Sequence, residues 1–341
     1  IELNREGEIL SYRFKKSVIH SKVRGVYAEV NQLFSGKADA QLKKKYAPVI
    51  RSLHAARELA DILKQRARKM GTMDLQSREA KFTLNEAGVC IDVQPRKSGE
   101  AEEMIEQLMI TANQAAAMLA KEANLPFIYR VHGSPDPDRV KSLVQLVNAL
   151  GINASCLDKE NPCPADFSGL LRRAKGTPAE RMISHQVLRT MEKAKYSADP
   201  LGHFGLFLKD YCHFTSPIRR YPDLAIHRIL SQYLATPAKK RDEITIKYGA
   251  FVKEAALQSS QCEIRAMTAE RSAEDCYMAE YMKAHIGECF DGIVSGVTMR
   301  GVFVELENMV EGFVPIESFV ECRYRFDGML AQVDEVTGKK L

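Results

Sequence analysis

Near residue 285 the spacing of apolar residues changes from a helical period to that of short strands. From about residue 241 to residue 284 they recur at three- and four-residue steps, which predicts one long helix. Beyond it, glycines interrupt short apolar runs such as Val302-Phe303-Val304, a pattern typical of a small β-barrel. The chain therefore combines two architectures in series. We predict one domain over residues 1–285 and the start of a second over residues 286–341.

Upstream of this boundary, strand and helix patterns follow one another, which predicts an α+β fold. Pro48 is expected to break or kink the helical region over residues 38–70, because proline lacks the N–H that a helix interior needs. The expected elements are a strand over 1–3, a half-buried strand over 8–20, a helix near 24–34, an amphipathic helical region over 38–70, a hairpin over 82–93 and a helix over 100–122.

The middle of the chain predicts more helices and one irregular stretch. Asp136 is expected to cap a helix that runs to about residue 150, where Gly151 supplies the stop. Further helices are expected near 165–175 and 178–194. Residues 196–220 have no sustained period and lead to a helix with Pro222 in its first turn, where a missing N–H is tolerated.

Composition narrows the class of protein. The 341 residues suit about two domains, and 45% hydrophobic with 27% charged residues is ordinary for a globular chain. The net charge of +5 mildly favours a polyanionic partner. The longest stretches without a charged residue, 107–120 and 142–157, are too short and too polar for a transmembrane helix, so we expect no membrane contact.

Cysteine usage and the chain ends carry two further expectations. Eight cysteines form no C-x-x-C pair and no signal peptide precedes them, which predicts reduced thiols in a cytoplasmic protein. Residue 1 is isoleucine, and each end interrupts an expected strand. We therefore expect the chain to be part of a longer protein.

A segment rich in phosphate-binding groups precedes the helix that begins near Pro222. Thr215 and Ser216 supply two hydroxyl groups, and Arg219 and Arg220 supply two guanidinium groups. Each of these groups suits a phosphate oxygen near a helix N-terminus. The alternative is structural: a hydroxyl caps the turn and both arginines pair with carboxylates. Spacing alone leaves both interpretations open.

Two other sets of polar residues are less specific. Glu263 and Glu270 lie two turns apart on one face of the long helix, where they are either solvated or available to orient an arginine or accept a hydrogen bond from a substrate hydroxyl. The histidines His203, His213 and His227 lack metal-ligand spacing. The sequence contains no Walker loop, G-x-S-x-G elbow, H-E-x-x-H motif or dinucleotide-binding fingerprint, so we expect no small-molecule cofactor.

Aromatic residues mark the expected strands of the terminal segment. Phe290, Phe303 and Phe313 lie there, with Arg300 and Arg323 nearby. Such side chains can stack on nucleic-acid bases, or they can fill the core of a barrel. The sequence leaves this choice open.

Taken as a set, these segments resemble the RNB family of exoribonucleases, which includes ribonuclease II and ribonuclease R. The most specific match is the run His213-Phe214-Thr215-Ser216-Pro217-Ile218-Arg219-Arg220-Tyr221-Pro222-Asp223-Leu224, with His203-Phe204-Gly205-Leu206 before it and His227-Arg228 after it. Shorter matches in the same order are Ser17-Val18-Ile19, Tyr27, Val30-Asn31, Glu79-Ala80-Lys81-Phe82, Ile105-Glu106, Met109-Ile110, Asn113, Tyr129-Arg130-Val131-His132 and Ala269-Glu270-Arg271. Residues 287–341 resemble the start of an S1 RNA-binding barrel. The resemblance covers essentially the whole chain.

This resemblance implies an RNB catalytic domain, a mixed sheet with long helices, followed by a partial S1 barrel of the OB type. It implies a processive hydrolase that degrades RNA from the 3′ end and releases nucleoside 5′-monophosphates with Mg²⁺. Arg219 matches the family's catalytic arginine, which holds the scissile phosphate and stabilises charge in the transition state. Glu270 matches a glutamate near the 3′-terminal nucleotide, Glu106 another that faces the RNA end, and Tyr27 a tyrosine that contacts the terminal nucleotides.

The same resemblance suggests further contacts and partners. Ser216 and Arg220 are candidate phosphate contacts, and Phe290 and Phe303 are candidate base contacts. The implied partner is RNA with a single-stranded 3′ end. Whether structured RNA is also a partner is left open. The ribosome is a further partner that the resemblance leaves open.

Three departures from the family pattern bear on mechanism. The aspartates that bind metal in the family lie upstream of the stretch that matches Ile1, so we expect no metal ligands in this chain. Leu75 stands about where many relatives carry an aromatic clamp for the terminal bases, which would weaken stacking there. Ile264 stands where relatives usually have arginine, which makes the role of Glu263 doubtful.

We therefore interpret the chain as the larger part of an RNB exoribonuclease that is not competent alone. A second hypothesis is a non-catalytic RNA-binding protein derived from that family. A third is an adaptor that docks on another nuclease or on the ribosome through a basic face. Loss of RNA affinity with rising salt would argue against the third.

Overall fold

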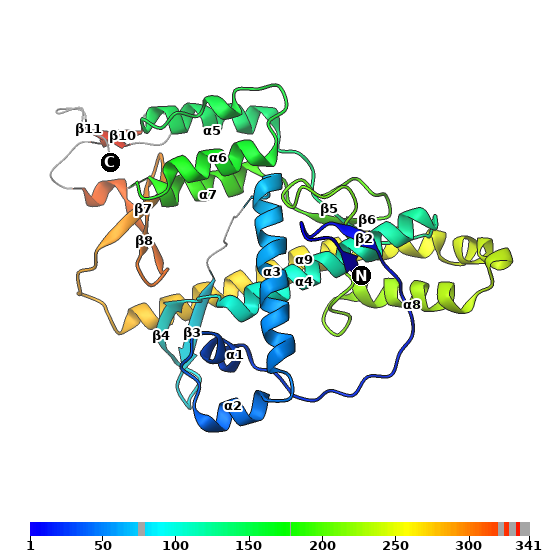
Figure 1. The fold of residues 1–341 in the computed structure, drawn as a ribbon. Coiled ribbons are helices and arrows are strands. Elements are labelled where there is room, and N and C mark those ends of the chain that lie inside the picture. The colour runs from blue at the N-terminus through cyan, green and yellow to red at the C-terminus, as the bar shows by residue number, and fades with distance from the viewer. Residues whose placement is uncertain (74–78, 178, 320–323, 327–331, 335–341) are drawn as a thin grey trace. The chain divides into compact units, whose positions relative to one another are not determined.

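The computed structural model describes residues 1–341 apart from 74–78, 178, 320–323, 327–331 and 335–341 (Figure 1). It contains two compact units, each made of three segments of the chain. The first unit comprises residues 1–73, 97–134 and 193–263, and the second comprises residues 74–96, 135–192 and 264–341. The boundary that the sequence predicts near residue 285 falls inside the second unit and stays a prediction.

The first unit is mainly helical, with two short antiparallel strand pairs. Its strands are β1 (Glu2–Leu3) paired with β2 (Ile9–Ser11), and β5 (Tyr129–Val131) paired with β6 (Lys195–Ser197). Its helices are α1 (Tyr27–Phe34), α2 (Ala40–Tyr46), α3 (Ile50–Met70), α4 (Glu100–Glu122), α8 (Tyr221–Ala235), the short 3-10 helix Ala238–Lys240, and the first half of α9 (Asp242–Lys283).

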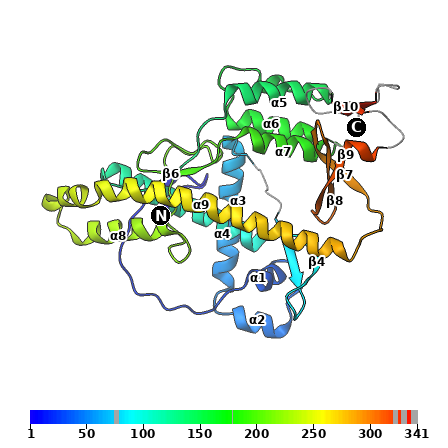
Figure 2. The ribbon, with the colours of Figure 1, turned by 180° about the vertical axis from the view of Figure 1, so that it is seen from behind.

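The core of the first unit is built against an alanine-rich face of α4. Ala116, Ala117 and Ala120 are fully buried there, and small side chains let neighbouring helices approach closely. Ile226 and Ile229 of α8 belong to the same apolar cluster, as do residues of β5 and of the first half of α9. Figures 1 and 2 show α4 and this half of α9 side by side. The cluster supports the loop that leads into α8.

The second unit combines a hairpin, a helical layer and a small sheet. The hairpin is β3 (Ala80–Leu84) with β4 (Cys90–Pro95), and the helices are α5 (Pro137–Ala149), the 3-10 helix Ser155–Leu157, α6 (Pro164–Ala174), α7 (Glu180–Thr190) and the second half of α9. The sheet is β7 (Gly292–Thr298), β8 (Gly301–Leu306) and β9 (Glu311–Pro315) in that order, followed by the 3-10 helix Ile316–Ser318 and by β10 (Tyr324–Phe326) paired with β11 (Gln332–Asp334).

Local signals explain where several helices begin and end. The side chain of Asp136 accepts hydrogen bonds from the backbone N–H groups of Asp138 and Arg139, and Gly151 adopts the left-handed conformation just after α5. Pro48 lies between α2 and α3, so the expected break is confirmed. The helices expected over 100–122 and 241–284 are also confirmed, as α4 and α9.

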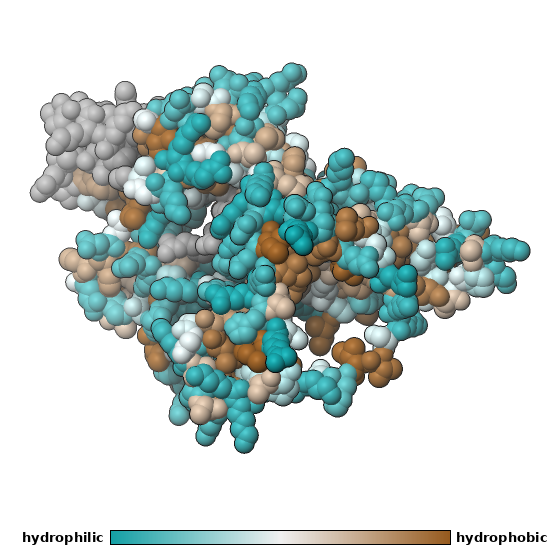
Figure 3. Space-filling model, in the orientation of Figure 1, coloured by the Kyte–Doolittle hydropathy of each residue, from teal (hydrophilic) through white to brown (hydrophobic). Residues whose placement is uncertain are grey.

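Two expectations were wrong in extent. The strand expected over 8–20 is limited to Ile9–Ser11, and residues 15–22 form an exposed connection to α1 in which Val18 is fully exposed and Ile19 is 84% exposed. The space-filling view shows apolar residues at the molecular surface among hydrophilic ones (Figure 3). Alternating side chains alone do not make a strand when no neighbouring strand pairs with the backbone. The helix expected over 178–194 ends at Thr190, because the chain turns there into β6.

Candidate anion-binding site at the start of α8

The loop over residues 212–220 presents its tip to solvent and then enters α8. Arg220 is the residue before the helix and is extended, with φ −126° and ψ 119°, and Pro222 lies in the first turn. Ile218 is 98% exposed, and its neighbour Arg219 is also exposed. The two residues at the tip are thus held out from the molecule while the rest of the loop is largely covered.

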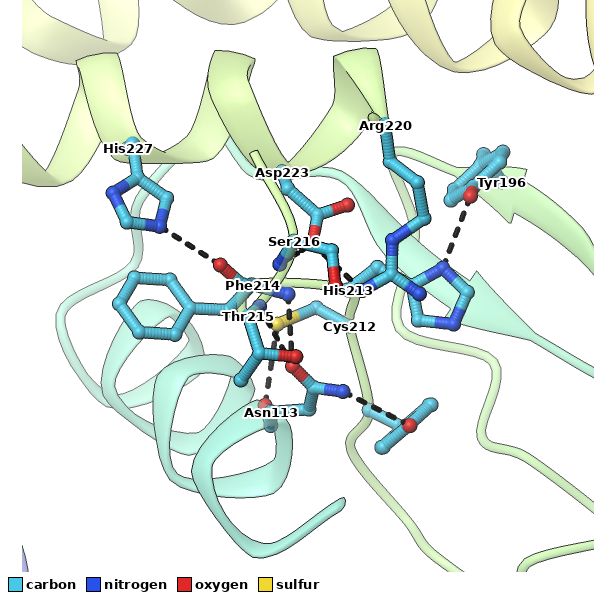
Figure 4. Close-up of polar contacts among 11 residues, drawn as sticks. Asn113, Tyr196, Cys212, His213, Phe214, Thr215, Ser216, Arg220, Asp223 and His227 are labelled. Carbon is cyan, nitrogen blue, oxygen red and sulfur yellow. Dashed lines mark hydrogen bonds and ion pairs between the residues drawn. The ribbon is translucent and has the colours of Figure 1, made fainter. Parts of the chain in front are cut away.

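Asn113 of α4 holds one side of this loop (Figure 4). Its side-chain oxygen accepts hydrogen bonds from the backbone N–H groups of Phe214 at 2.9 Å and of Thr215 at 3.2 Å. Its amide nitrogen donates to the hydroxyl of Tyr211 at 3.1 Å, and its backbone carbonyl accepts from the thiol of Cys212 at 3.2 Å. One buried asparagine therefore ties four residues between positions 211 and 215 to α4.

Asp223 holds the loop from the other side, within the first turn of α8. One of its carboxylate oxygens accepts the backbone N–H of Ser216 at 2.8 Å and the guanidinium of Arg220, also at 2.8 Å. The residue is fully buried. Arg220 thus forms an ion pair with an internal carboxylate. Ser216 is buried, and its N–H is bonded to the same carboxylate.

His227, one turn further along α8, fixes the backbone of Phe214. Its Nε2 donates to the Phe214 carbonyl at 2.8 Å, and the two rings stack with centroids 4.3 Å apart and planes at 7°. Phe14, from the segment after β2, meets the Phe214 ring edge-on at 5.5 Å. Both backbone groups of Phe214 are therefore bonded to side chains, which leaves this part of the loop little freedom.

The loop itself contains a neutral histidine, His213. Burial, together with the guanidinium groups of Arg220 and Arg130, with further contributions from His203 and Arg219, lowers the pKa of His213 to about 2. Burial raises the pKa of its partner Tyr196 to about 12. The Tyr196 hydroxyl lies 3.0 Å from His213 Nδ1, so a protonated hydroxyl can donate to a neutral imidazole. Burial is the larger cause of the lowered pKa of His213, and the nearby arginines add to it.

The arginines around His213 differ in their partners. Arg130 pairs with Glu263 at 2.6 Å and lies 4.6 Å from the centre of the Tyr196 ring. Arg220 pairs with Asp223. Arg219 has no carboxylate partner among the residues that the structure describes. Its exposed guanidinium therefore remains available for an external anion such as a phosphate group, which an arginine fork binds through two hydrogen bonds.

Two half-buried histidines, His132 and His203, order the neighbouring loop over residues 203–208. His132 Nδ1 accepts the N–H of Gly205 at 2.9 Å, and His203 Nδ1 accepts the N–H of Leu206 at 3.2 Å. Burial, with smaller contributions from His132 and Arg130, lowers the pKa of His203 to about 3. A neutral His203 ring keeps its Nδ1 free to accept, and both histidines accept backbone N–H groups of this loop.

Several residues that the sequence predicts for the site lie elsewhere in the first unit. Tyr27 is the first residue of α1 and is 46% exposed. Its position is set by buried Tyr46, whose hydroxyl accepts the Val26 N–H at 3.0 Å and donates to Glu29 at 2.6 Å. Glu106 is an exposed residue of α4, two turns before Asn113.

The other predicted residues belong to the second unit, and each is described there by itself. Glu270 is exposed on α9. Phe290 is 44% exposed and meets the His285 ring edge-on at 5.9 Å. Phe303 lies on β8 with its ring centre 5.0 Å from that of Phe313. Leu75 lies outside the described residues. The roles predicted for all of these residues stay predictions.

The sequence offered no role for Asn113, Asp223 or Tyr196, although they organise this site. The only signal for Asn113 is an amide just before Ala115, Ala116 and Ala117, which are apolar and buried. A polar side chain on such a helix face must find buried partners. Asp223 could be assigned as a first-turn acid of α8, but its bond to Ser216 could not.

Neither a metal-binding group nor a membrane-spanning helix is found in the described part of the chain. Within the described ranges, no three His, Cys, Asp or Glu side chains come together as a group able to hold a metal ion. Across those ranges, too, no helix combines the length and apolar character that a membrane crossing requires. The donor set of the described residues thus does not fit the metal that the family resemblance implies.

Comparison with known proteins identifies the class to which this fold and loop belong. The RNB domain model matches residues 1–236, and the S1 RNA binding domain model matches residues 283–325. The chain belongs to the RNB family, with an S1 segment after the RNB domain.

Individual relatives agree with this assignment. The chain is 36% identical over 343 aligned residues to ribonuclease R 1 of Lactococcus lactis, an alignment that covers 99% of this chain and 41% of that protein. It is 38% identical to ribonuclease R of Thermotoga maritima, with 95% of this chain and 45% of that protein covered. The structure of Mycoplasma genitalium RNase R with ribose-methylated single-stranded RNA matches with a TM-score of 0.80 and 30% identity, over 92% of this chain and 49% of that one. The chain thus spans less than half the length of these curated relatives.

Proposed function

We propose that the protein acts as a hydrolytic 3′-to-5′ exoribonuclease of the ribonuclease R type that releases nucleoside 5′-monophosphates processively. The observation that carries this proposal is the exposed guanidinium of Arg219, which has no carboxylate partner in the described part of the chain, beside two arginines that do. Membership of the RNB family and a resemblance to an RNA-bound ribonuclease R support RNA as the source of the phosphate.

Within this proposal the residues have separate roles. Arg219 holds the scissile phosphate and stabilises the charge that develops on it. Glu270 and Glu106 accept hydrogen bonds from hydroxyl groups of the terminal nucleotides, which separates RNA from DNA. Tyr27 contacts those nucleotides. Phe290 and Phe303 stack on bases nearer the S1 segment, while Ser216 and Arg220 are the weaker candidates for phosphate contacts because both already have internal partners.

The metal requirement is a separate part of the proposal. RNB-family nucleases generally depend on divalent metal ions, and Mg²⁺ is the ion we propose here. The described residues supply no fitting donor group, so we propose that the metal-binding aspartates belong to residues outside 1–341 of the complete protein. On this view residues 1–341 bind and orient RNA without hydrolysing it alone.

The proposed setting follows the sequence pattern. RNA with a single-stranded 3′ end is the proposed substrate, and duplex regions and the ribosome are further candidates. A cytoplasmic location agrees with eight cysteines that include no C-x-x-C pair.

The test is an RNA degradation assay on the complete protein with 5′-labelled single-stranded RNA, Mg²⁺ and a chelator control. We expect metal-dependent shortening of RNA but not of DNA. Arg219→Ala should lower kcat by about 10²- to 10³-fold, because a transition-state contact is lost, and should weaken RNA binding only a few fold. Arg219→Lys should recover part of the rate, since it keeps the charge without the fork.

Two outcomes would contradict the proposal. Unchanged turnover in Arg219→Ala would remove Arg219 from the phosphate site. RNA that is bound by the complete protein but never shortened, with or without Mg²⁺, would favour the non-catalytic RNA-binding alternative.

A further inference from the structure

Two buried polar side chains from different helices hold three consecutive backbone N–H groups. Asn113 of α4 accepts from Phe214 and Thr215, and Asp223 of α8 accepts from Ser216, at 2.9, 3.2 and 2.8 Å (Figure 4). In a helix or strand these N–H groups would bond to backbone carbonyls. Here the loop is shaped by side chains 101, 102 and 7 residues away in the sequence.

Besides these backbone bonds, the Asn113 amide donates to the Tyr211 hydroxyl and Asp223 pairs with Arg220, so the other partners of both side chains also belong to this loop or border it. Asn113 is 3% exposed on an otherwise apolar face, and Asp223 is fully buried with Oδ2 lacking any hydrogen-bond partner among the described residues. A buried carboxylate with an unsatisfied oxygen is unfavourable for stability. Its one clear effect is to fix Ser216 and Arg220, the residues on either side of the loop tip.

Backbone hydrogen bonds hold the loop tip between Ser216 and Arg220. The Ser216 carbonyl accepts the backbone N–H groups of Arg219 at 3.3 Å and of Arg220 at 3.1 Å. The backbone of Arg219 is therefore held on both sides. Its side chain is exposed and has no carboxylate partner within the described segments. Such an arrangement fixes the position from which the Arg219 side chain leaves the backbone.

We propose that Asn113 and Asp223 are positioning residues that hold Arg219 for phosphate binding in the transition state. The inference rests on the proposed function. Neither residue touches the substrate; both act through the loop. Reacting groups need placement within about 0.5 Å, and a displacement of about 1 Å can lower a rate by about a hundredfold. Loosening the loop should thus lower kcat more than it changes RNA binding.

The experiment measures kcat and KM on single-stranded RNA for variants of the complete protein. We expect Asn113→Ala to lower kcat at least about tenfold and to change KM by less than about threefold. Thr111→Val is the matched control, because Thr111 is buried on the same helix but its hydroxyl bonds only to the Gln107 carbonyl. This control should retain kcat within about twofold of the wild-type value.

A conservative pair keeps the test decisive if Asn113→Ala does not fold. Asp223→Asn retains an oxygen for the Ser216 N–H, whereas Asp223→Ala removes it. We expect Asp223→Asn to keep a higher kcat than Asp223→Ala. If the two variants differ in melting temperature, kcat is calculated for the folded fraction of each.

A double-mutant cycle separates positioning from general damage. If Asn113 acts through Arg219, its replacement should lower kcat much less in an Arg219→Lys background than in the wild type. Independent, multiplying effects would overturn the inference, as would a folded Asn113→Ala or Asp223→Ala variant with wild-type kcat. These results differ from failure of the proposed function, in which the wild-type protein degrades no RNA or Arg219→Ala keeps full turnover.

Discussion

Three arginines near one neutral histidine have three different environments. Arg130 pairs with Glu263, Arg220 pairs with Asp223, and Arg219 is exposed at a loop tip. Motif spacing left open whether both arginines of the motif pair with carboxylates. Arg220 pairs with a carboxylate and the adjacent Arg219 does not, because the backbone before α8 directs Arg220 toward buried Asp223 and Arg219 away from it.

The buried histidines make a testable contribution to stability. In the folded protein the pKa of His203 is about 3 and that of His213 about 2, whereas an unfolded histidine titrates near 6.5. The unfolded chain therefore binds more protons below that pH. The free energy of unfolding should be highest above about pH 6.5 and should fall as the pH drops from there toward about 3.

Urea unfolding at several pH values measures this effect. Between pH 6.5 and 5 we expect a loss of about 1 to 2 kcal/mol for each histidine, and His203→Gln should flatten the pH profile. His20→Gln is the control, because His20 is exposed. An equal slope in all three proteins would contradict the assignment of buried, neutral rings.

At the scale of elements, the start of α4 depends on a contact with α1. Asn31 donates to Glu102 at 2.8 Å and accepts the N–H of Ala101 at 2.9 Å, and Glu102 accepts the N–H of Gly99 at 3.1 Å. These bonds satisfy N–H groups that the first turn of a helix leaves unpaired. The helix that carries Asn113 and Glu106 is thus anchored at its first turn.

Two glycine substitutions should have opposite effects on stability. A Cβ at Gly99 would lie 2.3 Å from the amide nitrogen of Asn31, so Gly99→Ala should lower the free energy of unfolding by about 1 to 3 kcal/mol. Gly249 lies inside α9 with no atom within 4 Å of an added Cβ, so Gly249→Ala should raise it by about 0.8 to 1 kcal/mol. Chemical denaturation of both variants checks the signs, and a stable Gly99→Ala protein would show that Asn31 moves without loss.

At the scale of the whole molecule, residues of the S1 segment share an apolar cluster with residues some two hundred positions earlier. Val310 is 5% exposed and clusters with Cys90 and Val93 of β4, and Tyr277 and Tyr281 of α9 pack against them. The Glu280 carboxylate accepts the Cys90 N–H at 2.8 Å. The S1 segment therefore contributes to the packing of the second unit.

Removal of residues 286–341 should destabilise what remains. The truncated protein should expose the cluster around Cys90 and Val93, lower the melting temperature by several degrees and increase the binding of a hydrophobic dye. Phe290→Ala in the untruncated chain is the control, because this ring is 44% exposed and its loss should leave the melting temperature nearly unchanged. A truncated protein as stable as the intact one would support an independent domain ending near residue 285.

Local chemistry in the sequence was sufficient to predict most elements and the motif of the site. Helical periodicity, a capping aspartate at 136 and the break at Pro48 set α5, α9 and the division between α2 and α3, because such signals act between residues a few positions apart. The segment from His213 to Leu224 was sufficient to indicate the RNB family, which the comparisons confirm. Only the tertiary structure decided that Arg219 has no carboxylate partner among the described residues, that Asn113 reaches a loop about a hundred residues away and that Val310 packs against β4. Those facts depend on contacts between side chains that are far apart in the sequence, and no short-range sequence pattern specifies such contacts.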